Sequence, residues 1–129
     1  MSRNIETTDI QNEIDNQNEI PLWIIQVNDG WKEPVKRFLK RIDSLQKGNR
    51  AEDTKIQILK IKQKFGGVRV WIHHPEKLES IIEGYIGRLE GECYMTCELC
   101  GQAHTNGISK IGSWRCCICD VCKTNNNYD

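Results

Sequence analysis

Two closely spaced pairs of cysteines are the residues of this sequence with the clearest chemistry. Cys97 and Cys100 form one C-x2-C pair, Cys119 and Cys122 form the second, and 18 residues separate the pairs. This spacing is typical of four-thiolate zinc sites, in which each pair supplies two ligands of a tetrahedral ion. Because four thiolates leave no coordination position for water or a substrate, the pattern predicts a structural Zn²⁺ site rather than a catalytic one.

The same segment contains other side chains that compete as ligands: Cys93, Cys116, Cys117 and His104. Cys116 precedes Cys119 by three residues, so a pair formed by those two stays open. We prefer Cys97 with Cys100 because Gly101 follows them directly, and a glycine there lets backbone N–H groups turn toward the sulfurs.

Length and composition predict one modest domain with an appendage. The chain has 129 residues, of which 38% are hydrophobic, and no apolar run reaches the length of a membrane span. The seven cysteines would suit a disulfide-rich secreted scaffold, but no hydrophobic segment follows Met1. We therefore expect a cytoplasmic protein in a reducing environment, with bound metal and without a membrane partner.

The formal net charge of zero hides an uneven distribution. Residues 1–20 contain one arginine and five acidic residues, a net charge of −4, so the remaining residues have a net charge of +4. A segment with so few large apolar residues cannot offset its ordering entropy by burial, and residues 1–20 are predicted to be a disordered acidic tail. A partner-binding arm and a merely solvated tail are both open interpretations.

Apolar periodicity predicts the elements of a small core over residues 21–92. A short strand is expected at residues 22–27. A first helix is indicated by apolar residues at helical spacing: Trp31, Val35, Phe38, Leu39, Ile42 and Leu45. A second helix begins at Pro75 and has its own apolar stripe: Leu78, Ile81, Ile82, Tyr85, Ile86 and Leu89. Between them, residues 55–65 and 68–73 alternate as in a β-hairpin joined at Gly66 and Gly67.

The predicted fold class is therefore α+β, in the order helix, β-hairpin, helix. A zinc ribbon or zinc knuckle module over residues 93–129 follows this core. The second helix also has a bare face formed by Gly84, Gly87 and Gly91. Because each interior glycine weakens a helix, this face suggests close contact with another element or with a second copy of the chain, although a weak helix end leading into the zinc module is the slightly preferred explanation.

Basic and aromatic residues gather at the hairpin and in the loop between the cysteine pairs. The candidate binding residues are Lys60, Lys62, Lys64, Phe65, Gly66, Gly67, Arg69, Trp71, Trp114 and Arg115. Exposed backbone donors at a glycine turn, beside positive charge, suit a phosphate or an acidic protein surface. The solvent-exposed face of an ordinary two-stranded ribbon would look the same.

The sequence resembles a group of short bacterial and phage zinc proteins. The resemblance rests on Asp29–Trp31, on the run Lys62–Arg69 (K-x-K-F-G-G-[LV]-R in the group), and on the C-x2-C-G and C-D-x-C/H motifs at Cys97 and Cys119. It implies a small cytosolic zinc protein of bacterial or phage origin and supplies no activity. This chain departs from the group in its acidic leader and in the adjacent thiols Cys116 and Cys117.

These observations favour a non-enzymatic, zinc-stabilised interaction protein that binds and modulates a cellular macromolecule. No phosphate-binding loop, zinc-protease motif or nucleophile–base order is present in the sequence. A protein partner is the first expectation. The alternative is nucleic-acid binding through the basic and aromatic hairpin and the zinc loop.

Overall fold

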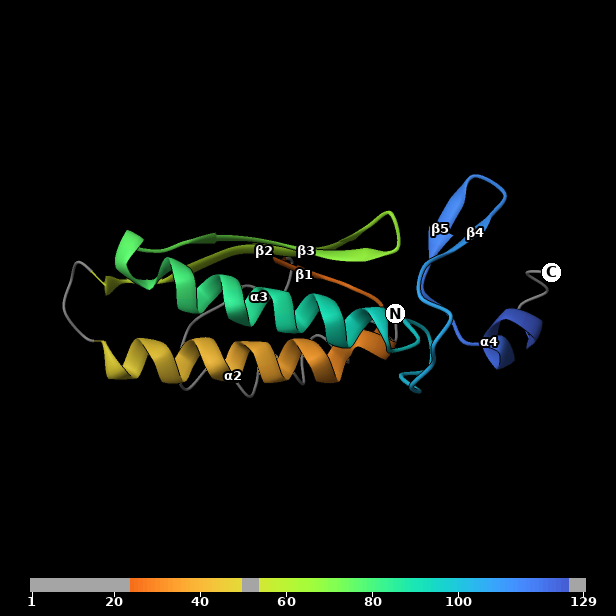
Figure 1. The fold of residues 1–129 in the computed structure, drawn as a ribbon, viewed down its shortest axis with the longest axis horizontal. Coiled ribbons are helices and arrows are strands. Elements are labelled where there is room, and N and C mark those ends of the chain that lie inside the picture. Colours follow the sequence, from red (N-terminus) through yellow and green to blue (C-terminus); the bar gives the residue numbers. More distant parts are fainter. Residues whose placement is uncertain (1–23, 50–53, 126–129) are drawn as a thin grey trace.

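The computed structural model describes residues 24–49 and 54–125, so the predicted acidic tail at residues 1–20 lies outside the described residues. The elements in chain order are β1 (Ile25–Gln26), η2 (Asp29–Trp31), α2 (Lys32–Gly48), β2 (Gln57–Lys64), β3 (Gly67–His73), η4 (Glu76–Leu78), α3 (Glu79–Tyr94), β4 (Ser109–Ile111), β5 (Trp114–Cys116) and α4 (Asp120–Asn125). The mixed α+β class is confirmed, and helix, hairpin and helix follow in the predicted order (Figure 1).

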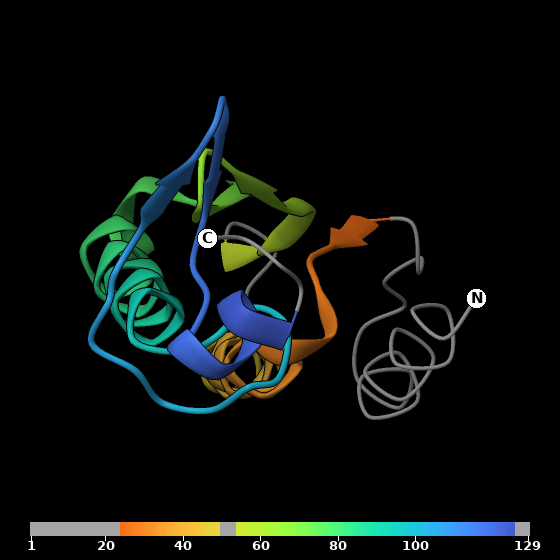
Figure 2. The same cartoon turned by 90° about the vertical axis from the view of Figure 1, so that its right-hand side faces the viewer.

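The molecule has two lobes (Figure 1). The core lobe, residues 24–49 and 54–94, has a three-stranded sheet in the order β1-β2-β3, with α2 and α3 packed on one side of it (Figure 2). β1 runs parallel to β2, with Ile25 opposite Ile61, and β2 pairs antiparallel with β3. The metal lobe, residues 95–125, consists of a turn around Cys97, the β4–β5 hairpin and the short helix α4.

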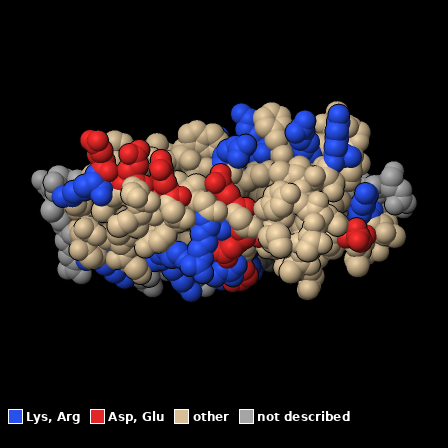
Figure 3. Space-filling view, in the orientation of Figure 1, with Lys and Arg blue, Asp and Glu red and all other residues tan. Residues whose placement is uncertain are grey.

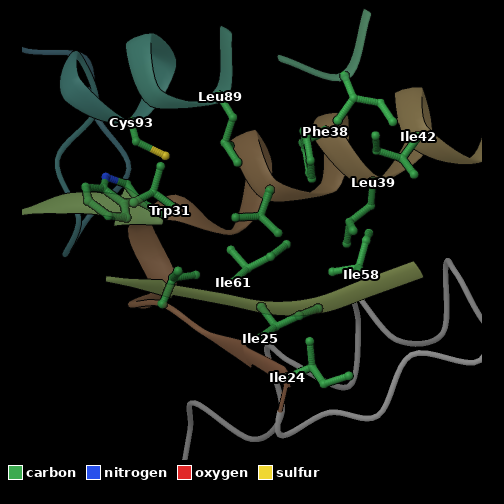
Figure 4. Packing of buried hydrophobic residues seen from close by; sticks show 14 of the residues in the cluster. Ile24, Ile25, Trp31, Phe38, Leu39, Ile42, Ile58, Ile61, Leu89 and Cys93 are labelled. Carbon is green, nitrogen blue, oxygen red and sulfur yellow. The ribbon is translucent and has the colours of Figure 1, made fainter. Parts of the chain in front are cut away.

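The apolar stripe predicted for the first helix forms the centre of the core. Trp31, Val35 and Phe38 are completely buried and belong to one cluster with residues of the sheet and of α3. Figure 4 shows Trp31 and Phe38 in this cluster with Ile61 and Leu89. Ile61 of β2 packs into the same cluster from the sheet. Because burial of each such side chain is worth about 1.5–3 kcal/mol, this cluster is sufficient to define the lobe.

The stripe predicted for the second helix is only partly correct. Leu78, Ile82 and Leu89 are buried, but Ile81 is 46% exposed. Neighbouring helical residues are rotated by about 100° from one another, so burial of Ile82 turns Ile81 away from the core. At the far end, Glu92 of α3 accepts hydrogen bonds from the Arg37 guanidinium at 2.6 and 2.8 Å, which ties α3 to α2.

The turn of the hairpin differs from the prediction by one residue. Lys64 pairs with Gly67, so the two-residue loop is Phe65 and Gly66, and Gly67 belongs to β3. Both loop residues have positive φ, 54° for Phe65 and 79° for Gly66. Consecutive positive φ values match the right-handed twist of the flanking strands, and glycine adopts them without strain. The loop therefore presents a phenylalanine ring at the tip of the hairpin.

The glycine face of α3 has no packing partner among the described residues. A Cβ atom added at Gly84, Gly87 or Gly91 would meet nothing within 4 Å. No helix of the described part of the chain combines the length and the apolar character needed to cross a membrane.

Candidate metal centre and hairpin groove

The four cysteines paired by their spacing come together in the metal lobe. Their sulfur atoms all lie within 4.8 Å of one another. The Sγ atoms of Cys100 and Cys119 are 3.7 Å apart, close to the separation of about 3.8 Å expected for two thiolates on one tetrahedral zinc ion. None of the seven cysteines forms a disulfide. The geometry therefore fits a metal ion held by Cys97, Cys100, Cys119 and Cys122.

Local backbone structure places each pair of thiols. Gly101, at a φ of 81°, donates its N–H to the Cys97 carbonyl at 2.9 Å and closes the turn that contains the first pair. Cys119 precedes α4 and Cys122 lies in its first turn, where the Cys122 N–H points at the Cys119 sulfur at 3.5 Å. The sequence did not predict this short helix, because six residues are too few for a periodic signal.

The backbone around Cys97 favours ionisation of its thiol. Burial opposes its ionisation, but backbone hydrogen bonds at Cys100 and Cys119 outweigh burial and lower the pKa of Cys97 to about 7. A thiolate is the form of cysteine that binds metal. The backbone of the metal lobe therefore stabilises the charge that a metal ligand needs.

The competing thiols have other roles. Burial raises the pKa of Cys93, and burial together with the nearby Glu98 raises the pKa of Cys117 to about 12. The pKa values of the proposed ligands Cys100 and Cys122 are raised as well, so the positions of the sulfur atoms, and not the pKa values, separate the two sets. Cys117 contacts the Cys93 carbonyl at 3.2 Å and His104 Nε2 at 3.3 Å. Cys116 lies 3.9 Å from the Ser109 carbonyl. Among the described residues, only the four cysteines predicted as ligands form a cluster of three or more potential metal ligands.

The metal lobe is joined to the core lobe at Gly30 and Trp31. The Gly30 N–H donates to the Glu98 carbonyl at 2.8 Å, and a Cβ atom at Gly30 would lie 2.5 Å from the carbonyl carbon of Glu98. The indole N–H of Trp31, which is fully buried, donates to the Thr96 carbonyl at 2.9 Å. Asp29–Trp31, one of the segments behind the family resemblance, thus lies at the contact between the lobes.

Glu98, between the two ligands of the first pair, reinforces this contact. Glu98 is 7% exposed, and its carboxylate accepts hydrogen bonds from the Asn28 amide at 3.1 Å and from the Cys117 N–H at 3.0 Å. Sequence reasoning gave Glu98 and Gly30 no role at this contact, and it named Cys117 only as a competing metal ligand. A glutamate in a C-x2-C loop gives no periodic signal, and only its burial marks it as structural.

The tip of the β2–β3 hairpin packs against the β4–β5 hairpin. Gly66 is buried, and a Cβ atom there would lie 2.7 Å from the Ile108 side chain and 3.3 Å from the backbone of Arg115. This glycine is thus used for close packing between the lobes, whereas the sequence suggested exposed backbone donors at this turn. A larger residue would push the two hairpins apart.

An open groove of about 1040 Å³, which we call the hairpin groove, lies between the two hairpins. Six predicted binding residues line it: Lys62, Lys64, Phe65, Gly66, Trp114 and Arg115. Two rings on its rims are strongly exposed, Phe65 at 66% and Trp114 at 77%. Lysine and arginine side chains gather over both hairpins, at the upper right of Figure 3. The one acidic residue that lines the hairpin groove is the buried Glu98, which is already hydrogen bonded.

Three other predicted binding residues lie on the outer face of the sheet instead of in the groove. The ammonium of Lys60 lies 5.7 Å from the centre of the exposed Trp71 ring. Arg69 is opposite Lys62 in the register and reaches Glu90 at 4.0 Å. Gly67, the remaining predicted residue, is part of the β3 backbone.

A smaller hollow of about 570 Å³ lies beside the first cysteine pair and differs in charge. Asp29 and Glu33 line it together with Lys32 and Arg37, and Arg37 is already paired with Glu92. The balanced charges give this hollow no preference for an ion of either sign. The hairpin groove is therefore the better candidate binding surface.

Comparisons of this chain with protein-family models, with curated proteins and with solved structures returned no match.

Proposed function

We propose that this protein is a small, non-enzymatic, zinc-stabilised binding module that holds an anionic macromolecular partner in the hairpin groove. The observation that supports the proposal is that residues of both lobes form the groove. Its cations come from both lobes, Lys62 and Lys64 from the core lobe and Arg115 from the metal lobe. The groove exists only while the two hairpins stay together.

Zinc is the metal that suits the donor set best. Four thiolates at tetrahedral separation are typical of structural Zn²⁺ sites and leave no open position for a catalytic water. The ion would be held by Cys97, Cys100, Cys119 and Cys122, in a knuckle-type module. Its contribution would be to hold the β4–β5 hairpin in place, and this supports a binding function over an enzymatic one.

The cysteines, none of which forms a disulfide, and the resemblance described above support a reducing, cytoplasmic location in a bacterium or an infected bacterial host. In that setting the partner would be a cellular protein with an acidic surface or a nucleic acid. Both present the negative charge that the groove complements. Modulation of that partner is the expected biological effect.

Affinity capture with a matched pair of charge reversals tests the proposal. Lys64→Glu changes an exposed lysine of the groove at the end of β2. Lys55→Glu changes an exposed lysine that precedes the start of β2 and does not line the groove. The tagged, zinc-loaded proteins are incubated with bacterial lysate, and the bound protein and nucleic acid are quantified. We expect Lys64→Glu to lose a partner that Lys55→Glu retains. Equal capture by both variants, or no partner for the wild type, would overturn the proposal.

A further inference from the structure

The exposed rings of the hairpin groove distinguish between the two classes of anionic partner. Phe65 occupies the two-residue loop between β2 and β3, and Trp114 is the first residue of β5, so each ring stands at the tip of a hairpin. They are among the most exposed large apolar side chains of the described residues. The Lys64 ammonium lies 5.6 Å from the centre of the Phe65 ring. An acidic protein surface would need the cations of the groove but not two exposed rings.

The positive charge continues from the groove along the outer face of the sheet. Lys62 and Arg69 are directly opposite each other in the β2–β3 register, an arrangement of like charges that destabilises a sheet. Glu90 is the only acidic side chain within ion-pair distance of this pair among the described residues. A cationic strip that costs stability and leads to two exposed rings fits an extended, negatively charged ligand.

We infer that the hairpin groove binds single-stranded nucleic acid, an inference that rests on the function proposed above. The phosphates contact Lys62, Lys64 and Arg115, and unpaired bases stack on Phe65 and Trp114. Stacking of bases on aromatic side chains in a basic groove is how proteins bind single strands without sequence preference. A duplex keeps its bases stacked on one another, so it satisfies the cations and leaves the rings unused.

The number of contacts sets the expected salt dependence. Each phosphate contact on a single strand contributes about −0.7 to the slope of log K against log salt concentration. Three cations therefore predict a slope of about −2. Lys64→Gln should make this slope less steep by about 0.7, whereas Lys55→Gln, which lies outside the groove, should leave it unchanged.

The rings set the expected loss of affinity. Replacing one stacking ring by alanine should weaken binding by roughly 5- to 150-fold. Trp114→Phe keeps a stacking surface and should restore most of the affinity that Trp114→Ala loses. Because Trp114 is 77% exposed, its replacement leaves the buried core intact, and an unchanged metal content verifies the fold of each variant.

Fluorescence anisotropy on the zinc-loaded full chain tests the inference, with labelled dT15, U15, a 15-base-pair duplex and a 15-residue polyglutamate as probes. We expect the single strands to bind more tightly than the duplex and polyglutamate. Trp114→Ala should show the loss of affinity given above, and Lys64→Gln the change in salt slope. Tighter binding of polyglutamate, or no single-strand binding at low salt, would overturn the inference. The proposed function would still stand if lysate capture depended on Lys64, and it would fall as well if capture did not.

Discussion

The two lobes of this protein are held together by different physical means. The core lobe packs an extended set of buried apolar residues around Trp31, Phe38 and Ile61. The buried cluster of the metal lobe has only Cys97, Ile118 and Cys119, and two of these are proposed metal ligands. Apolar burial stabilises the first lobe. One buried isoleucine cannot offset the ordering entropy of some thirty residues, so in the second lobe the proposed metal ion would supply the missing stabilisation.

The comparison also shows why the lobes are not independent. Trp31 belongs to the core cluster but hydrogen bonds to Thr96 in the metal lobe, and Cys117 of the metal lobe packs into the core cluster. The core therefore provides a fixed surface, and the proposed metal site would hold the β4–β5 hairpin against it. The proposed binding residues from both lobes depend on that arrangement.

Removal of a proposed metal ligand should produce the largest difference in stability between the two lobes. In Cys119→Ala we expect loss of stoichiometric zinc and loss of structure in residues 95–125, because metal binding to such a site contributes on the order of 10 kcal/mol to folding. Amides of α2 and β2 should stay protected in hydrogen exchange. Cys116→Ala is the matched control, since Cys116 lies outside the four-sulfur cluster. Full zinc content in Cys119→Ala would show that the ligand set is wrong.

A methyl group at the contact between the lobes should have the next largest effect. In Gly30→Ala the new Cβ atom overlaps the Cys97 and Glu98 backbone, and overpacking of this kind costs about 1–3 kcal/mol. We expect a lower free energy of unfolding in urea and faster amide exchange in the metal lobe than in α2. Unchanged stability would mean that the lobes do not pack as closely as described.

The polar part of the same contact can be removed separately. Trp31→Phe keeps a buried ring but deletes the indole donor to the Thr96 carbonyl, so we expect a loss of about 1 kcal/mol in urea unfolding. Trp114→Phe serves as the control, because that indole is mostly exposed. If both substitutions had the same effect, the hydrogen bond between the lobes would not contribute.

Alanine substitutions on the glycine face of α3 should have the smallest effect, and they should raise the free energy of unfolding. Gly84→Ala and Gly87→Ala should each raise the free energy of unfolding by up to about 1 kcal/mol, because both positions are helical, exposed and sterically open. The molar mass from light scattering should not change. A lower mass in the variants would instead show that two copies associate through this face, as the sequence allowed.

Prediction from sequence succeeded where one element or one short motif contained the signal. The helix that buries Val35, Phe38 and Ile42 was read from its period, and the four clustered cysteines were read from their spacing. It was wrong at Ile81, because a period with several adjacent apolar residues does not state which of them faces the core. It also placed the hairpin turn one residue too late.

The sequence by itself determined the local elements and the proposed metal ligands, because a helical period and a C-x2-C spacing act over a few residues. Only the tertiary structure decided that Gly30 meets Glu98, that Gly66 meets Ile108, and that Lys64 and Arg115 line one groove. These contacts join residues far apart in the chain. Packing between lobes sets them, and it leaves no repeating pattern in the sequence.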